Sequence, residues 1–90
     1  MHYLVGAAEL EAGQHDDALA SLARALELHP DYHQARVALA RVLEALGQLD
    51  QAGEQVALVL GQEPDHPQAL ALQERWARRR RRAAPDFTDA

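Results

Sequence analysis

The sequence predicts an all-α protein made of antiparallel helix–turn–helix repeats, and three observations lead to that fold class. Ala and Leu dominate the composition, Ile is absent, and Val is the only β-branched residue used repeatedly, which favours helices. Apolar residues recur at intervals of three and four, the spacing of one buried helical face. The chain also repeats itself at a fixed interval, with glycine and proline at matching offsets.

The repeat appears when the sequence is compared with itself at the offset that brings Gly13 onto Gly47, and the matches fall where backbone geometry is most demanding. In the first two units the identical pairs are Gly13 and Gly47, Gln14 and Gln48, Asp16 and Asp50, Ala18 and Ala52, Ala23 and Ala57, Leu26 and Leu60, Pro30 and Pro64, and Asp31 and Asp65. A third copy begins with the pairs Gln34 and Gln68, Ala35 and Ala69, and Arg41 and Arg75. Because one such unit cannot bury its apolar face alone, the copies are expected to stack.

Each unit is interpreted as two helices joined by a turn centred on glycine. The apolar face of the first unit is predicted to comprise Val5, Ala8, Ala12, Leu19, Leu22, Ala23 and Leu26. The small residues expected where paired helices approach closely are Gly6, Ala18, Ala40 and Ala52. Helices are predicted at about residues 2–12, 16–28, 32–46, 50–62 and 66–82.

The predicted helix ends follow from glycine, aspartate and proline. Gly13 can take the left-handed conformation that ends a helix without a side-chain penalty. Asp16 is predicted to cap the next helix, Pro30 to stop it, and Asp31 to cap the helix that follows. The same signals recur at Gly47, Asp50, Pro64 and Asp65.

Cysteine and long apolar segments are both missing from the sequence, and this excludes several classes of protein. Without cysteine there is no disulfide framework and no thiolate nucleophile or metal ligand. The longest apolar runs, such as Val56 to Leu60, are far too short to span a bilayer. The segment from Met1 to Gly6 lacks the positive flank and cleavage site of a secretory signal, so we expect a cytoplasmic protein without a membrane partner.

The candidates for catalytic or metal-binding chemistry have simpler structural explanations. His29 and His33 are four residues apart, but Pro30 between them breaks the helix that would aim both rings at one ion. Asp16 and the acid after it lie at a helix start, where carboxylates stabilise the free amides. Ser21, the only serine, has no base beside it in a recognisable motif. The sequence therefore predicts no catalytic residue, no metal site and no cofactor.

The period that relates Gly13 to Gly47, with Gly, Ala and Pro at fixed offsets, resembles that of the tetratricopeptide repeat. That family's pattern is Trp, two residues, Leu-Gly, two residues, Tyr, then Ala, three residues, Phe, and finally Pro. The corresponding residues of the second unit are Arg36, Leu39, Ala40, Leu43, Ala52, Val56 and Pro64. Those of the first unit are His2, Val5, Gly6, Glu9, Ala18, Leu22 and Pro30. Because His2 and Glu9 depart from the pattern, the first helix is expected to be irregular or shortened.

The resemblance covers residues 1 to about 77 and implies a short right-handed α-solenoid of about five helices within a domain at 1–82. The predicted divisions are repeat one (1–32), repeat two (33–66), a capping helix (67–82) and a disordered tail (83–90). Trp76 is expected to close the core at the capping helix. Phe87, in the tail, could dock into a partner or another copy, although a frayed end is the simpler expectation.

The same resemblance implies that the first helices of successive pairs line a concave groove, and that the chain is a non-catalytic scaffold binding another polypeptide there. The residues expected to face this groove are Tyr3, Leu4, Ala7, Leu10, Gln34, Val37, Ala38, Arg41, Gln68, Ala71, Leu72 and Arg75. An apolar surface flanked by two arginines suits an amphipathic helix or extended peptide that carries a carboxylate. Members of the family that bind chaperones hold a C-terminal carboxylate in the groove with Lys, Arg and Asn. This sequence contains no Lys and no Asn, which argues against chaperone binding.

Two alternatives to peptide binding stay open. The exposed apolar surface, or the open end of the stack, could meet a second copy in a homodimer. The run at Arg78–Arg82 could contact nucleic acid phosphates, although it also suits the negative end of the last helix. Residues 1–74 carry a net charge of −9, against +4 for residues 75–90, and the acidic body would repel a polyanion.

Overall fold

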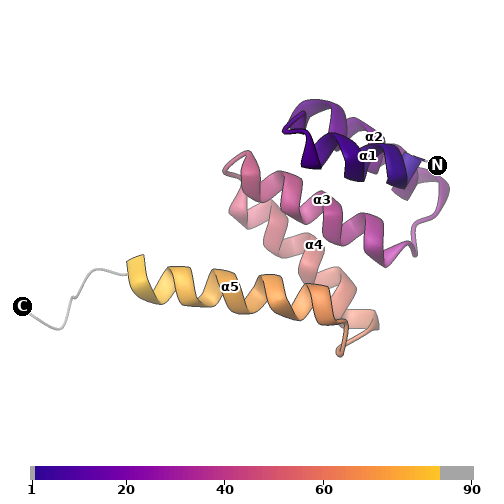
Figure 1. Cartoon of the computed structure of the whole chain (residues 1–90). Coiled ribbons are helices and arrows are strands. Elements are labelled where there is room, and N and C mark those ends of the chain that lie inside the picture. Colours follow the sequence, from indigo (N-terminus) through magenta and orange to yellow (C-terminus); the bar gives the residue numbers. More distant parts are fainter. Residues whose placement is uncertain (1, 84–90) are drawn as a thin grey trace, which may run out of the picture.

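The computed structural model describes residues 2–83, and every regular element within them is a helix. The helices are α1 (His2–Glu11), α2 (His15–Leu28), α3 (His33–Ala45), α4 (Leu49–Gln62) and α5 (Pro67–Ala83). α1 pairs with α2, α3 pairs with α4, and the pairs stack through α2 and α3, with α5 packed against α4 (Figure 1). This confirms the all-α helical repeat, with each predicted helix end correct to within a residue. None of the helices among residues 2–83 has both the length and the apolarity needed to cross a membrane.

Gly13 and Gly47 end the first helix of each pair in the same way. Their φ angles are +80° and +82°, in the left-handed region. After α1, the Gln14 amide donates to the Glu9 carbonyl at 2.8 Å and the Gly13 amide to the Leu10 carbonyl at 3.1 Å. The turn after α3 repeats both bonds at the equivalent residues, at 2.8 and 3.0 Å. These paired bonds satisfy carbonyls that a helix end otherwise leaves free.

The prediction that aspartates cap the helices is wrong. Asp16 and Asp50 lie inside the first turns of α2 and α4, whereas Asp31 and Asp65 lie in the turns before α3 and α5. α2, α3 and α4 have no side-chain cap hydrogen bond. α5 is capped instead by His66, whose Nδ1 accepts from the Ala69 amide at 3.3 Å. The helices start next to the aspartates rather than at them, so the acids in first turns act through the helix dipole.

The core consists of two apolar clusters that share α3. The buried residues of the first cluster are Ala18, Leu22, Ala25, Ala35, Ala38 and Val42. Those of the second are Val37, Ala40, Leu43, Ala52, Val56, Val59, Ala69, Leu72 and Trp76. Leu19 and Leu39 pack against both clusters, which joins them. Trp76 is 9% exposed and closes the second cluster, as predicted.

The close approaches predicted at small residues are confirmed. Ala18, Ala40 and Ala52 are fully buried, and Gly6 is buried against α2. A Cβ atom added to Gly6 would lie 2.7 Å from Leu22 Cγ, which is too close for any real contact. α1 is regular despite its departures from the family pattern, although at 10 residues it is the shortest helix.

The apolar face predicted for α1 is wrong. Val5 is 50% exposed, and Ala8, Ala12 and, in α2, Ala23 are exposed as well. The inward side of α1 instead carries Gly6 with the half-buried Tyr3, Ala7 and Leu10. The repeat register explains the error, because Val5, Ala8 and Ala12 correspond to Leu39 and Val42 of α3 and to Leu46 just after it, which pack in the cluster that contains the buried residues of α2. No described helical pair precedes α1 to cover the same positions.

Candidate functional site

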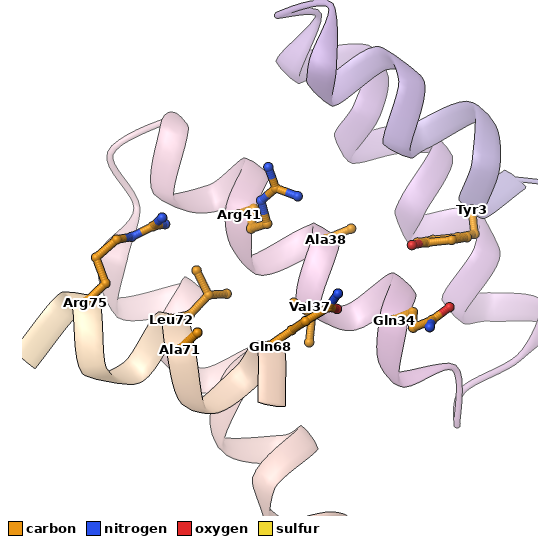
Figure 2. A pocket seen from close by; sticks show the side chains of 9 residues that line it. All are labelled: Tyr3, Gln34, Val37, Ala38, Arg41, Gln68, Ala71, Leu72 and Arg75. Carbon is orange, nitrogen blue, oxygen red and sulfur yellow. The ribbon is translucent and has the colours of Figure 1, made fainter. Parts of the chain in front are cut away.

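A groove of about 190 Å³ crosses the first helices of successive units (Figure 2). Its lining residues are Tyr3, Gln34, Val37, Ala38, Arg41, Gln68, Ala71, Leu72 and Arg75. All of them come from α1, α3 and α5. The stacking of the pairs therefore gathers side chains from both ends of the sequence on one surface.

The floor of the groove is apolar and firmly packed. Val37 and Leu72 are only 3% and 5% exposed and belong to the second core cluster, whereas Ala38, at 6%, belongs to the first. At the α1 end, the ring of Tyr3 packs on Tyr32 with centroids 5.0 Å apart. A ligand side chain entering the groove would thus meet a surface held by the core itself.

The rim of the groove is polar, and the sequence repeat sets its pattern. Gln34 on α3 and Gln68 on α5 are a repeat pair, and so are Arg41 and Arg75. These four side chains are exposed or partly so. Two amides and two guanidinium groups therefore occupy equivalent positions on neighbouring helices, beside the apolar floor.

Glu44 of α3 holds Arg75 at the edge of the groove. Its carboxylate pairs with Arg75, accepts a hydrogen bond from Trp76 Nε1 at 2.9 Å and lies 3.2 Å from Arg79 Nη2. The Glu44 side chain is only 13% exposed, whereas about half of each arginine side chain is exposed. One sheltered carboxylate faces two guanidinium groups, so a net positive charge remains at this end of the groove.

Arg41 has a weaker partner. Its Nη2 atom lies 3.7 Å from Glu11 Oε2, and the two side chains are 46% and 74% exposed. An exposed pair of this kind contributes about 0 to 1 kcal/mol. Arg41 can therefore exchange Glu11 for another carboxylate at little cost.

The structure brings together most, but not all, of the residues predicted to face the groove. Leu4, Ala7 and Leu10 are not among the lining residues. Leu4 is 66% exposed because it follows Tyr3 by one residue, which turns it about 100° around α1. Glu44 was not predicted to take part. The repeat comparison could have indicated Glu44, because this acid replaces the apolar Leu10 that occupies the equivalent position of the first unit.

Other sequence candidates lie away from the groove or beyond the described part of the chain. Arg78 and Arg79 begin the arginine run and are exposed, while the side chains of residues 80–82 lie outside the described set. Of the tail predicted at 83–90, Ala83 belongs to α5, and 84–90 lie outside the described residues. His33 lies with its Nε2 atom 3.6 Å from Glu63 Oε1. Within residues 2–83, no group of three or more His, Cys, Asp or Glu side chains is placed to hold a metal ion.

The tetratricopeptide repeat family model matches residues 9–75 of this chain. The match begins in α1 and ends in α5, so it includes both glycine turns and most of the groove. No curated protein and no solved structure gives a significant match. Repeats of this family generally mediate protein–protein interactions, typically as non-catalytic scaffolds. The family model covers most of the chain, and the structure shows the helical pairs of the family, joined at Gly13 and Gly47. The chain therefore belongs to the tetratricopeptide repeat family.

Proposed function

We propose that this chain is a non-catalytic scaffold that binds a peptide or helix of a partner protein in the groove formed by α1, α3 and α5. The observation that carries the proposal is the pairing of a buried apolar floor with a rim of glutamines and arginines. Grooves of this composition suit a segment that inserts an apolar side chain and aligns itself by charge. Membership of the tetratricopeptide repeat family supports the same class of function.

The chemistry of the groove specifies what its ligand should carry. An apolar side chain would rest on Leu72 and the exposed Ala71, and a neighbouring carboxylate would reach Arg41 or Arg75. Arg41 can give up its exposed partner, and Arg75 shares one carboxylate with Arg79. The expected ligand is therefore a peptide in which Asp or Glu lies close to an aliphatic or aromatic residue.

Peptide display on the immobilised protein tests this proposal. A random peptide library should yield sequences in which an acid accompanies an apolar residue. Binding of these peptides, measured by calorimetry, should weaken at least about tenfold, or ~1.4 kcal/mol, in Arg41→Glu and in Ala71→Asp. The first change replaces attraction by repulsion, and the second places a charge on the apolar surface.

Matched controls make the same chemical changes outside the groove. Arg24→Glu alters an exposed arginine of α2, and Ala57→Asp alters an exposed alanine of α4. Both control variants should bind the selected peptides as the unchanged protein does. Equal binding by all four variants would show that the peptides do not use this groove.

The exposed face of α1 favours self-association as a second candidate function. Leu4 and Val5 are 66% and 50% exposed, and they continue onto exposed Ala8 and Ala12. The equivalent positions of α3 are covered in the stack, so the surface has the character of an interface. A homodimer through α1 should sediment at twice the monomer mass and dissociate in Val5→Glu. A monomer at all concentrations would contradict it.

A further inference from the structure

Glu44 interrupts the repeat, and its carboxylate has three partners on α5. The equivalent residue of the first unit is Leu10, so the acid stands where that unit has an apolar side chain. The Oε1 atom of Glu44 contacts Arg75, whereas its Oε2 atom accepts from Trp76 Nε1 at 2.9 Å and lies 3.2 Å from Arg79 Nη2. Because the Glu44 side chain is only 13% exposed, these partners replace much of its hydration.

The two arginines are about one turn apart on α5, but only one of them lines the groove. Arg79 follows Arg75 by four residues, which places both side chains on the same face of the helix. Arg75 lines the groove, and Arg79 does not (Figure 2). About half of each side chain is exposed, so each can reorient at the surface. Glu44 therefore connects a groove residue to a cation that lies outside the groove.

A ligand carboxylate that binds Arg75 competes with Glu44 for the same guanidinium. In a simple pair of Arg75 and Glu44, the ligand would leave a sheltered carboxylate without a cation, and an unpaired charge of this kind is costly. Arg79 changes this balance, because it can stay beside Oε2 of Glu44 when Arg75 turns away. The Trp76 indole can also keep its hydrogen bond to that oxygen. The second cation thus lowers the cost of releasing the first.

We propose that Arg79 is a positioning residue for peptide binding, because its contact with Glu44 leaves Arg75 free to bind a carboxylate of the ligand. The inference rests on the proposed function and adds to it a residue that does not touch the ligand. On binding, the Arg75 guanidinium passes from Oε1 of Glu44 to the carboxylate of the peptide. Arg79 still compensates the charge of Glu44, so the sheltered carboxylate keeps one cation.

Chemical modification of the protein without any peptide tests the availability of Arg75. Phenylglyoxal modifies arginine side chains, and a guanidinium held by a carboxylate reacts more slowly than a free one. Mass spectrometry of the digested protein gives the rate at each arginine. Arg79→Gln should slow the modification of Arg75 about fivefold, the largest effect of a single exposed ion pair, since Glu44 then pairs with Arg75 alone. Adding Glu44→Gln should restore the rate, because Gln carries no charge but can still accept from the Trp76 indole.

Arg78→Gln is the matched control, because it removes the same charge from a neighbouring exposed residue that is not among the contacts of Glu44. The rate at Arg75 should not change in this variant. Equal rates at Arg75 in Arg79→Gln and Arg78→Gln would overturn the proposal. A slower rate that Glu44→Gln does not restore would also overturn it. So would a faster rate in Arg79→Gln, which is expected if Arg79 only holds α5 in place.

The peptides selected by display provide a second measurement. Their affinity should fall about fivefold in Arg79→Gln, change by less than about twofold in Arg78→Gln, and recover when Glu44→Gln is added to Arg79→Gln. Peptides that bind Arg41→Glu and Ala71→Asp as tightly as the unchanged protein would contradict the proposed function. Peptides that use the groove but bind equally to Arg79→Gln and Arg78→Gln would overturn this inference alone.

Discussion

Gly47 shows how a single residue determines where a helical pair turns. Its φ angle is +82°, and no atom lies within 4 Å of the place that a Cβ atom would occupy. A side chain at this position would therefore meet open space, and only the backbone conformation would oppose it. The same holds for Gly13, one repeat earlier.

We expect Gly47→Ala to lower the free energy of unfolding by about 1 to 2 kcal/mol, the cost of holding an L-residue in the left-handed conformation. Urea denaturation measures this change. Gly61→Ala is the matched control, because Gly61 also faces open space but lies within α4 with no positive φ. The control should be neutral or stabilising by up to ~1 kcal/mol. Equal losses in both variants would rule out the left-handed turn as the constraint.

At the scale of elements, α5 differs from the other helices because no partner helix follows it in the described part of the chain. Ala69, Leu72 and Trp76 attach it to the second core cluster. Glu44 adds a polar attachment, since this one side chain of α3 contacts Arg75, Trp76 and Arg79 of α5. Apolar packing and a partly buried polar network thus hold α5 against the helices that precede it.

We expect Glu44→Ala to destabilise the protein by about 1 to 3 kcal/mol, because it leaves the indole N–H of Trp76 and the guanidinium of Arg75 without their shared partner. Urea denaturation followed by the fluorescence of Trp76 reports both stability and the attachment of α5. Glu27→Ala, which removes an exposed partner of Arg24, should change stability by less than ~0.5 kcal/mol. An effect of Glu44→Ala no larger than that of Glu27→Ala would show that the Glu44 contacts do not hold α5.

At the scale of the whole molecule, α3 is the element that joins the two core clusters. It contributes Ala35, Ala38 and Val42 to one cluster and Val37, Ala40 and Leu43 to the other. α1 lies at the edge of the stack, and Gly6 is its only buried residue among those described. Stability in a stacked repeat protein is a sum over neighbouring contacts, so it should fall from α3 towards α1.

Hydrogen exchange followed by mass spectrometry tests this gradient. Backbone amides of α3 should be the most protected, and those of α1 should exchange fastest among the helices of the two complete pairs. Val5→Glu, on the exposed face of α1, should leave the gradient unchanged in the monomer. Uniform protection from α1 to α4 would instead indicate a single cooperative unit.

Much of the fold could be predicted because the repeat signals are local. The fixed repeat interval, the glycines at 13 and 47 and the prolines at 30 and 64 marked the helices to within a residue. Predictions failed where they depended on the exact start of a helix or on which neighbouring helix covers a surface. The aspartate caps were wrong because α2 and α4 begin one residue before Asp16 and Asp50, and the apolar face of α1 was wrong because no described helix covers it.

The sequence by itself determined the number of helices, their pairing about glycine and the family, because backbone preference and apolar periodicity are properties of short segments. The tertiary structure alone decided that Glu44 would bind two arginines and an indole, and that only one of these arginines would line the groove. Those features depend on side chains that meet across helices far apart in the chain. The distances between these side chains and their exposure are set by the stacking of the helical pairs. The apolar periodicity within a single helix therefore does not predict them.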